Sequence, residues 1–426
     1  MISLTYYSLS RSPYSMTDKA RYALHINLPS TGLIQAADVV ILEDRGHVNQ
    51  VGFRYRPEYL ELPSAIAIDP ISLPLSPKEL AIECRGGIPA FLDDYLPDAW
   101  GRRVLSYAVL KQTGEKMNAN SAIACLNALR RSRIGALELT AINEQPLYHL
   151  GIAWEELAQA EKIAHQIDTL SFEEIPHESL DLIYLANEGS GAGGARPKSL
   201  VYRGNEAFLA KFNRLGSDQF NVARVELACL KMAKAAGLKV YNGELVEDLT
   251  GRDALLLERF DISGSHRRHL ISINGLRKDA YQRDDAGVFR YDDIHKLLQS
   301  HSTHFCEDAE QLLRQMLFNR AINNTDDHER NFSMINDGSG YRLSPAYDLV
   351  PSLTTGAYHV AGYQYSPYPP KPSEIINQGK VFGLDKTTVK NIAEQVVDAI
   401  QQWEDFAAEC KVSDSDCSAI KRLLSI

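Results

Sequence analysis

The segment NNTDDHERNFSM, residues 323–334, places five titratable side chains, Asp326 to Arg330, between asparagines and an apolar stretch. A solvated turn is the ordinary explanation for such a run of charges. A reaction loop is the alternative, because a carboxylate beside a metal-binding oxygen is what a proton-accepting, metal-assisted site requires. The rest of the chain has to decide between the two.

The composition limits the class of protein. The 426 residues allow two or three domains, and 44% hydrophobic and 23% charged residues are typical of a globular protein with an ample core. A net charge of -10 argues against a protein that mainly coats nucleic acid. Two basic clusters are interpreted as solvated faces or loops for one partner: Arg130, Arg131 and Arg133, and His266, Arg267, Arg268 and His269.

The cysteines and the N-terminal residues predict a cytoplasmic protein. The six cysteines are scattered without a C-x-x-C pair, which indicates neither a disulfide framework nor a zinc site and fits a reducing compartment. The first 16 residues lack a basic segment followed by an apolar run, so we expect no signal peptide. No apolar stretch approaches the roughly 18 residues that a spanning helix needs, so no membrane partner is expected.

Residues 1–150 are predicted to form an α+β domain. The segment 38–56 indicates two strands around a turn at Asp44, Arg45 and Gly46. Pro97 begins a helical pattern, and a second helix (119–131) and a strand (136–142) follow. No residue of this domain is assigned to chemistry.

The remainder of the chain predicts a nucleotide-binding part, residues 151–265, and a mainly helical lobe, residues 266–426. Two helical patterns (153–168 and 178–188) precede a glycine-rich segment (189–198). A hairpin with its turn at Gly204 and Asn205 follows, and then an amphipathic helix (219–236) and two strands. The fold class is therefore α+β.

The glycine-rich segment GSGAGGARPK could bind an anion, because a backbone without Cβ atoms lets its N–H groups approach a polyphosphate. A flexible linker is the alternative. Lys211 lies on the second strand of the hairpin, and Glu226 lies on the helix that follows, where it can face that strand. A lysine held by a helix glutamate and directed at phosphates is the arrangement that kinases use. A solvated lysine and a surface glutamate would explain the same residues.

Three further positions complete a phosphotransferase pattern. Glu258, Arg259 and Phe260 end an apolar strand where a hinge would offer backbone groups to adenine, although an edge strand explains the same sequence. Asp326 is followed five residues later by Asn331, which matches the D-x-x-x-x-N spacing of a kinase catalytic loop. Asp348 follows a short hairpin, as a magnesium-binding aspartate would.

The motifs GGARPK, ERFD, NTDDHERNFS and SPAYDL, in this order and spacing, resemble those of HipA-type serine/threonine kinases. The segment AFLDDYLPDAWGRRVL resembles the N-terminal part of the same family, so the resemblance covers residues 35–355. It implies a two-lobed protein-kinase-like fold, with an N-terminal α/β lobe and a mainly helical C-terminal lobe. The cofactors that it implies are ATP and Mg²⁺.

The resemblance also implies site residues. Asp326 would be the catalytic base, and Asn331 and Asp348 would be the magnesium ligands. The residues that would bind the nucleotide are Gly193, Gly194, Ala195, Arg196, Pro197, Lys198, Lys211, Glu258, Arg259, Phe260, His328, Glu329, Arg330, Asn331, Tyr347 and Asp348.

The partners implied by the resemblance are a protein substrate and an antitoxin. The substrate would be an aminoacyl-tRNA synthetase or another translation factor. The antitoxin would be a small helix-turn-helix protein that contacts DNA, so this chain would meet DNA only indirectly. Members of the family autophosphorylate a serine in the glycine loop. Here the matching position is Gly191, and Ser190 is the best candidate. Asp327 stands where the family often has glycine, a difference that we expect to be harmless at an exposed position.

Two other functions fit parts of the pattern. A small-molecule kinase of the aminoglycoside-phosphotransferase type uses the same base and metal, but GGARPK and ERFD argue against it. A pseudokinase that serves only as a co-repressor scaffold would have no need to keep Lys211, Asp326, Asn331 and Asp348 together. A metal phosphohydrolase would need several converging histidines or carboxylates, and only His328 lies near the loop.

Overall fold

The computed structural model describes residues 17–85, 87–129, 135–146, 151–170, 174, 196–214, 216–264, 266–281, 287–336, 338–353 and 358–426. The strands are β1 (Thr17–Leu28), β2 (Gly32–Asp44), β3 (His47–Tyr55), β4 (Leu80–Glu83), β5 (Leu137–Ala141), β6 (Ile152–Ala153), β7 (Lys198–Arg203), β8 (Glu206–Phe212), β9 (Gly243–Val246), β10 (Ala254–Glu258), β11 (Ile262–Ser263), β12 (His266–Arg267), β13 (His269–Ser272), β14 (Ser333–Asn336) and β15 (Tyr341–Leu343). The helices are α1 (Pro57–Leu60), α2 (Ala90–Tyr95), α3 (Ala99–Thr113), α4 (Ala122–Ala128), α5 (Leu157–Thr169), α7 (Val222–Ala235), α8 (Ile273–Tyr281), α9 (Tyr291–His301), α10 (Phe305–Ala321), α11 (Pro372–Ile375), α12 (Lys386–Gln401), α13 (Trp403–Glu409) and α14 (Asp414–Lys421).

The N-terminal sheet has the strand order β4-β3-β2-β1-β5, and all its pairings are antiparallel. The predicted turn between β2 and β3 is confirmed, because Arg45 and Gly46 both have positive φ, at 51° and 84°. Alternate side chains of β1 to β3, such as Leu24, Ile41 and Phe53, are buried at 1% exposure or less. They form one hydrophobic core with α2. The sequence analysis identified β2 and β3 but not β1.

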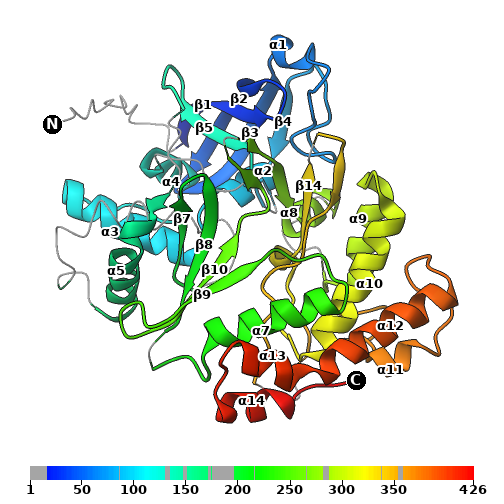
Figure 1. Cartoon of the computed structure of the whole chain (residues 1–426). Coiled ribbons are helices and arrows are strands. Elements are labelled where there is room, and N and C mark those ends of the chain that lie inside the picture. Colours follow the sequence, from blue (N-terminus) through cyan, green and yellow to red (C-terminus); the bar gives the residue numbers. More distant parts are fainter. Residues whose placement is uncertain are drawn as a thin grey trace.

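The second sheet has the order β6-β7-β8-β10-β9 and lies in the middle of the molecule (Figure 1). The predicted β7–β8 hairpin is confirmed, with Gly204 at φ 62° in its turn. The antiparallel register sets Lys198 directly opposite Lys211. Both lysines therefore lie at the same end of the hairpin, because alternating strand geometry keeps paired residues side by side.

One face of the second sheet packs against α3 and α5. Trp100 and Val104 of α3 share a hydrophobic core with Ile163 of α5 and with Val201 and Phe208 of the sheet. The helix α3 begins at Asp98, whose side chain caps it by accepting from the backbone N of Gly101 at 2.8 Å. The chain thus leaves the core of the N-terminal sheet before α3 and returns to it at α4, and the domain boundary at residue 150 stays a prediction.

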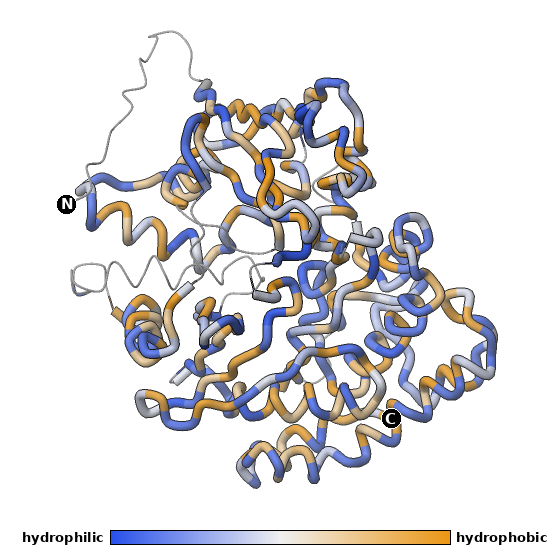
Figure 2. Tube along the Cα trace, turned by 45° about the horizontal axis from the view of Figure 1, so that its top comes forward, coloured by the Kyte–Doolittle hydropathy of each residue, from blue (hydrophilic) through white to orange (hydrophobic). Residues whose placement is uncertain are grey.

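The C-terminal part of the chain is mainly helical, as the sequence predicts. The helices α7, α10, α12 and α13 bury one continuous core, in which Met316, Leu317 and Trp403 are exposed by 1% or less. Hydrophobic and hydrophilic residues alternate along the helices near the C-terminus (Figure 2), as expected for helices with one buried face. Within the described part of the chain, no helix combines the length and the apolar character needed to cross a membrane.

A three-stranded sheet, β13-β14-β15, joins this lobe to the N-terminal sheet. The β14–β15 hairpin was predicted, but β13 was not. The interpretation of residues 266–269 as a solvated basic cluster is wrong for two of them, because Arg267 is 6% and His269 is 2% exposed. The His269 Nε2 atom lies 2.7 Å from the carbonyl oxygen of Ile68, in the N-terminal domain. The strand β13 has only four residues and α8 follows it directly, so the alternation of its side chains was too short to identify it. The other basic cluster lies outside the described residues.

Candidate active site

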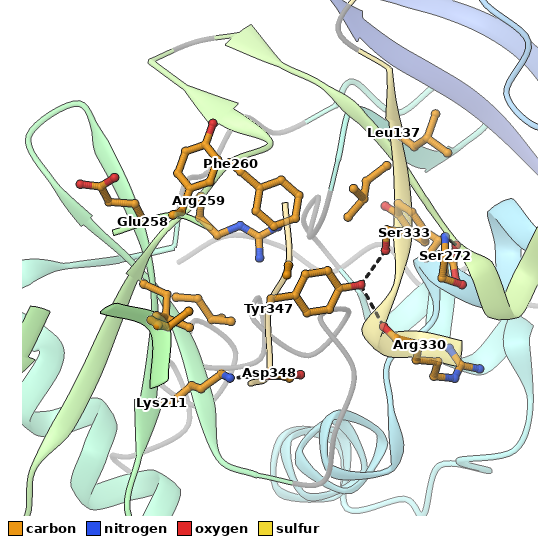
Figure 3. Close-up of a pocket in the computed structure, with 18 of the residues that line it drawn as sticks. Leu137, Lys211, Glu258, Arg259, Phe260, Ser272, Arg330, Ser333, Tyr347 and Asp348 are labelled. Atoms are coloured by element: carbon orange, nitrogen blue, oxygen red, sulfur yellow. Dashed lines mark hydrogen bonds and ion pairs between the residues drawn. The ribbon is translucent and has the colours of Figure 1, made fainter. Parts of the chain in front are cut away.

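A pocket lies between the second sheet, the β14 strand and the N-terminal domain (Figure 3). It encloses about 1080 Å³ of space, open solvent included. Seven of the predicted site residues line it. They are Lys211, Glu258, Arg259, Phe260, Arg330, Tyr347 and Asp348.

The charged end of the pocket is a cluster of Lys211, Glu226 and Asp348. The Lys211 Nζ atom lies 2.6 Å from Glu226 Oε1 and also contacts Asp348 Oδ1. Glu226 projects from α7 and is 2% exposed, and Lys211 is 14% exposed. The predicted placement of Glu226 opposite the lysine strand is thus what the structure has. Three charges share one small volume from which water is largely excluded.

Mutual attraction decides the protonation of this cluster. Burial opposes charge on Lys211, but the carboxylates of Asp348 and Glu226 outweigh it and raise the pKa of the lysine. Burial likewise opposes ionisation of Asp348, yet Lys211 and Lys198 lower its pKa. Burial raises the pKa of Glu226, although Lys211 counteracts the shift. Lys211 and Asp348 are therefore the firmly charged pair, and Glu226 is the weaker acid.

The second lysine at this end, Lys198, is paired with the N-terminal part of the chain. It is 3% exposed, and its Nζ lies 3.5 Å from Asp98 Oδ2 at the start of α3. Burial lowers the pKa of Lys198, and Asp98 and Asp348 counteract this. Arg196, two residues earlier, forms an ion pair with Asp218 at 2.9 Å. Pro197 is buried and its carbonyl accepts from the backbone N of Phe212 at 3.2 Å.

The other end of the pocket is aromatic. The ring of Phe260 lies over Tyr347 with centroids 6.0 Å apart and near Tyr241 at 5.7 Å. The Tyr347 hydroxyl lies 2.7 Å from Ser333 Oγ and donates to the Arg330 carbonyl at 3.0 Å (Figure 3). Glu258 is the last residue of β10, and its carboxylate accepts from Asn242 Nδ2 at 3.0 Å. Arg259 Nε donates to Asp261 Oδ1 at 2.7 Å. Flat apolar rings next to strand-end backbone groups form a slot suited to an aromatic base.

The loop quoted at the outset borders the pocket from the helical lobe. The Asp326 carboxylate is 76% exposed and lies 4.0 Å from His328 Nε2. The Asn331 Nδ2 atom donates to the Asp326 carbonyl at 2.8 Å, and Asn331 is buried. Partial desolvation, together with the charges of Asp348 and Asp327, raises the pKa of Asp326 although His328 counteracts it. A raised pKa brings a carboxylate closer to the range in which it accepts protons efficiently.

Asp327 is buried whereas its neighbour Asp326 is exposed, so our expectation of an exposed position for Asp327 is wrong. Its side chain is 0% exposed. Its carboxylate accepts from the Tyr291 hydroxyl at 2.9 Å and from the backbone N of Ala361 at 3.0 Å, and it lies 3.0 Å from His359 Nδ1. Asp327 therefore fixes the loop from within, and a run of charges in the sequence gave no sign of which aspartate points inward.

The asparagines that bracket the loop tie it to the segment around Asp348. Asn324 Nδ2 donates to the Asp348 carbonyl at 3.1 Å, and Asn323 Nδ2 donates to the Ser352 carbonyl at 2.7 Å. Asp348 itself has φ 55°, a left-handed conformation that aspartate and asparagine adopt more readily than other side chains. The crowded segment is thus a fixed loop and not a solvated turn.

The N-terminal domain contributes residues to the pocket that the sequence did not predict. Phe91, Tyr95 and Leu137 line the pocket. Asp93 accepts from Arg330 at 2.8 Å and from Asn274 at 2.8 Å, so α2 holds the loop from outside. Asp94 accepts from the backbone N of Ser272 at 2.6 Å, and burial with the nearby Asp93 raises its pKa to about 6. Two adjacent aspartates in an otherwise apolar segment were the available signal.

The last predicted residues are Glu329 and the glycine-rich segment. Glu329 lies within the loop and accepts from Arg277 at 3.3 Å. Gly193, Gly194, Ala195 and Ser190 lie outside the described residues.

The residues present fit a magnesium ion only together with phosphates. No group of three or more His, Cys, Asp or Glu that could hold a metal occurs among the described residues. Asp348 and the Asn331 amide oxygen are, however, the sparse set of oxygens that Mg²⁺ uses when phosphates supply further ligands. Lys198 and Lys211 meet three carboxylates, Asp98, Glu226 and Asp348, so the fully ionised cluster carries one negative charge, which a cation would offset.

These features define the class of the protein: a mixed α and β, kinase-like fold whose pocket lies between two lobes. The chain belongs to the HipA family. A model of the HipA-like C-terminal domain matches residues 190–404, and a model of the HipA N-terminal domain matches residues 34–140. The family expectation from the motifs is thereby confirmed.

The chain is similar to two known proteins, one by structure and one by sequence. The HipA protein of Shewanella oneidensis MR-1, solved as a toxin–antitoxin complex with HipB and its operator DNA, is 16% identical with a TM-score of 0.66. The superposition covers 94% of each chain and shows a shared fold. A Sinorhizobium fredii protein named "Putative kinase Y4mE" is 29% identical over 141 residues. That match covers 31% of this chain and 32% of the relative, so it spans about a third of the relative's length.

Proposed function

We propose that this protein is an ATP- and magnesium-dependent serine/threonine protein kinase that acts as the toxin of a toxin–antitoxin pair. The observation that carries the proposal is the Lys211–Glu226–Asp348 cluster at one end of an aromatic-lined pocket, with the exposed Asp326 beside it. Membership of the HipA family and the name of the Sinorhizobium relative support the same reading.

The proposed roles follow from the positions of the side chains. Asp326 accepts the proton of the attacking hydroxyl, for which its exposure to incoming substrate is suitable. Lys211 and Lys198 meet the phosphates, and Asp348 with Asn331 would hold Mg²⁺, which supplies charge neutralisation of the transferring phosphoryl group. Glu258, Arg259, Phe260 and Tyr347 border the base. His328, Glu329 and Arg330 shape the loop, and the segment Gly193 to Lys198 would cover the phosphates.

Exposed apolar residues next to Asp326 favour a protein substrate over a small molecule. Four of the seven large hydrophobic residues exposed in the described part of the chain come from two segments near this loop: Val288, Tyr358, Val360 and Tyr365. The backbone N of Val360 donates to the carbonyl of Thr325, one residue before Asp326. The bridge between Arg290 and Gly362 brings the segment of Val288 next to the segment of Val360. Exposed apolar side chains near the proposed reacting carboxylate offer contacts to a protein chain.

The identity of the partners rests on the family. We propose a translation-related protein such as an aminoacyl-tRNA synthetase as substrate, and a small DNA-binding antitoxin as inhibitor, because the Shewanella HipA was solved with HipB and operator DNA. We also propose Ser190 as the autophosphorylated serine. A small-molecule kinase would have no use for the exposed apolar side chains, and a pseudokinase would have no use for an open Asp326.

The test is phosphate transfer from labelled ATP in a lysate of a strain that lacks the gene, with mass spectrometry of the labelled proteins. We expect transfer with Mg²⁺, none with EDTA, and none with the Asp326→Gln variant. Asp348→Ala should also weaken nucleotide binding, measured by calorimetry. Transfer to an aminoglycoside in place of a protein would support the small-molecule alternative, and ATP binding without transfer to any acceptor would support the pseudokinase.

A further inference from the structure

The position of α7 decides whether Lys211 has its glutamate partner. Glu226 lies one turn inside the helix, and its 2.6 Å ion pair with Lys211 is almost fully buried. A shift of α7 by little more than an ångström would separate the two atoms beyond hydrogen-bond distance. What holds the beginning of this helix therefore matters for the lysine.

The first residues of α7 are bonded to the chain that carries Lys211. Asn221 is the N-cap of the helix, and its Oδ1 accepts from Asn213 Nδ2 at 2.8 Å. The Oδ1 atom of Asn213, two residues beyond Lys211, accepts in return from the backbone N of Ala223 at 2.9 Å. The helix start and the lysine strand thus form one unit, on which any outside hold on Asn221 acts directly.

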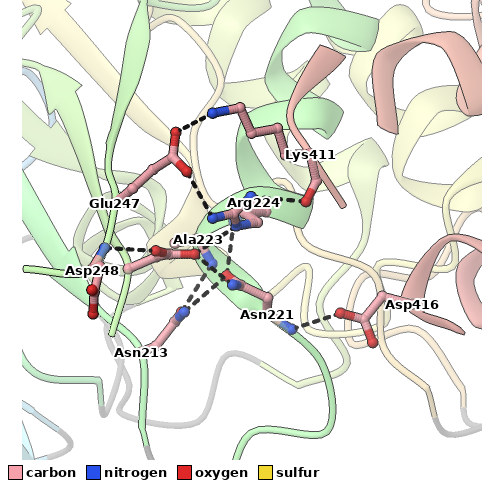
Figure 4. A network of polar contacts seen from close by, with 9 residues as sticks. Asn213, Asn221, Ala223, Arg224, Glu247, Asp248, Lys411 and Asp416 are labelled. Carbon is pink, nitrogen blue, oxygen red and sulfur yellow. Dashed lines mark hydrogen bonds and ion pairs between the residues drawn. The ribbon is translucent and has the colours of Figure 1, made fainter. Parts of the chain in front are cut away.

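That outside hold comes from a short segment near the C-terminus, residues 409–416, which we name the C-terminal strap (Figure 4). Asp416 Oδ2 accepts from the backbone N of Asn221 at 3.1 Å. The Lys411 carbonyl accepts from Arg224 Nη1 at 2.9 Å. Glu409 forms an ion pair with Lys231, two turns further along α7. Three residues of the strap thus bind the N-cap and two further residues of α7.

The strap also closes a ring with the β9–β10 connection. Lys411 Nζ lies 2.6 Å from Glu247 Oε1, whose other oxygen accepts from Arg224 Nη2 at 3.2 Å. Asp253 accepts from Arg224 Nε at 2.6 Å and from Asn221 Nδ2 at 2.7 Å. Arg224 is therefore held between the sheet and the strap, and the strap residues complete the ring from the side of the helical lobe (Figure 4).

We propose that Glu409, Lys411 and Asp416 are positioning residues that hold α7 where Glu226 meets Lys211. This inference rests on the proposed kinase function, in which Lys211 binds the phosphates. The ion pairs of the strap are exposed, with Lys411 66% and Glu409 56% exposed, whereas the pair that they support is buried. A partner bound to the strap, or a modification of it, would thus alter the position of α7 and with it the Lys211–Glu226 pair.

The experiment compares matched pairs of charges. The strap variant is Glu409→Gln with Lys411→Met. The control is Glu404→Gln with Lys421→Met, which makes the same two substitutions in an exposed 2.7 Å pair that joins α13 to α14. We expect the KM for ATP to rise about fourfold in the strap variant, because both of its charges belong to the ion pairs that hold α7. We expect a rise of less than twofold in the control, because an exposed ion pair away from α7 contributes little.

A third substitution sharpens the comparison. Adding Asp416→Ala to the strap variant should raise the KM for ATP about tenfold in all, with a smaller change in kcat. Adding Asp416→Asn should not, because asparagine keeps an oxygen that accepts from Asn221 N. Hydrogen exchange of the amides in the first two turns of α7 should speed up in the Ala variant only, at a temperature where each protein is fully folded.

The outcomes separate this inference from the proposed function. If the wild-type protein transfers phosphate and the strap variant with Asp416→Ala has the KM and the exchange in α7 of the control, the inference is wrong. If the wild-type protein transfers no phosphate, the kinase proposal fails, and ATP affinity by calorimetry with the same variants still decides whether the strap positions α7. Uniformly faster exchange throughout the protein would indicate a general loss of stability and would also overturn the inference.

Discussion

The two sides of the pocket handle charge in opposite ways. On the α7 side, Lys211 is buried between Glu226 and Asp348, and it forms an ion pair with each of them at hydrogen-bond distance. On the loop side, Asp326 is 76% exposed and has only His328 at 4.0 Å. Buried charges need partners to offset their desolvation, whereas an exposed carboxylate can stay open to an incoming group. The charges of the α7 side therefore stabilise one another, whereas the carboxylate of the loop side stays accessible.

The largest effect should come from the open side. Asp326→Asn keeps the size of the side chain but removes the proton acceptor, so we expect kcat to fall by about 10²–10⁴. Nucleotide affinity and the unfolding midpoint should stay within error of the wild type, because little of this side chain is buried or bonded. Steady-state kinetics and calorimetry measure the two quantities. A variant with wild-type kcat would remove Asp326 from the reaction.

The buried side should respond in affinity and stability together. Glu226→Gln leaves Lys211 with Asp348 alone, so we expect a loss of about 2 kcal/mol in unfolding free energy and a tenfold or so weaker affinity for ATP. Glu244→Gln is the control, since Glu244 pairs with Arg203 at 2.5 Å on the same sheet but is 42% exposed. The control should lose less than about 1 kcal/mol in denaturant unfolding. Equal losses in both variants would show that burial does not distinguish the Lys211–Glu226 pair from the Arg203–Glu244 pair.

A substitution next to Asp326 should reproduce the buried behaviour on the loop side. Asp327→Asn replaces one acceptor by a donor that faces the Tyr291 hydroxyl and His359. We expect a loss of about 1–2 kcal/mol in unfolding free energy and a decrease of several-fold in kcat as the loop loosens. Denaturant unfolding with kinetics on the same samples measures both. An Asp327 variant that matches Asp326→Asn, inactive but fully stable, would reverse the roles assigned to the two neighbours.

The smallest effect concerns pH. The pKa of Asp94 is about 6 in the folded protein and its ordinary value is 3.8, so the folded state binds a proton that the unfolded state releases. Its contribution to stability is therefore present below pH 4 and lost as the pH rises through 6. Asp94→Asn does not titrate, so the wild type should lose about 1 kcal/mol relative to this variant between pH 4 and pH 7. Unfolding midpoints across this range that run parallel in the two proteins would contradict the shift.

The sequence predicts those parts of the fold in which local signals act alone. The turn at Arg45 and Gly46, the hairpin at Gly204 and the amphipathic helix α7 are encoded by their own residues, and all are found where expected. The strand β13 is not, because four residues next to a helix carry too short a period. The β1 strand was missed although Pro29, Ser30 and Gly32 mark the turn that joins it to β2.

The site was predicted where one motif supplies several residues and missed where distant segments meet. The spacing of Asp326 and Asn331 identified the loop, but only the fold shows that Asp326 points outward while Asp327 points inward. Asp93, Asp94 and Asp98 escaped notice because their partners are more than 90 residues away in the chain, as with Asp98 and Lys198 at 3.5 Å. Side-chain direction and long-range pairing are tertiary properties that a single sequence does not display.

The change of hydrophobic core between α2 and α3 has a mechanical consequence. The N-terminal sheet is bonded to the helical lobe, through His269 with Ile68 and through Arg330 with Asp93, whereas α3 is packed on the second sheet. The connection Leu96–Asp98 and the return from α3 to α4 therefore both cross between the two halves of the pocket. We expect any opening of the pocket to bend these two connections, with the N-terminal sheet moving together with the helical lobe and α3 moving together with the second sheet.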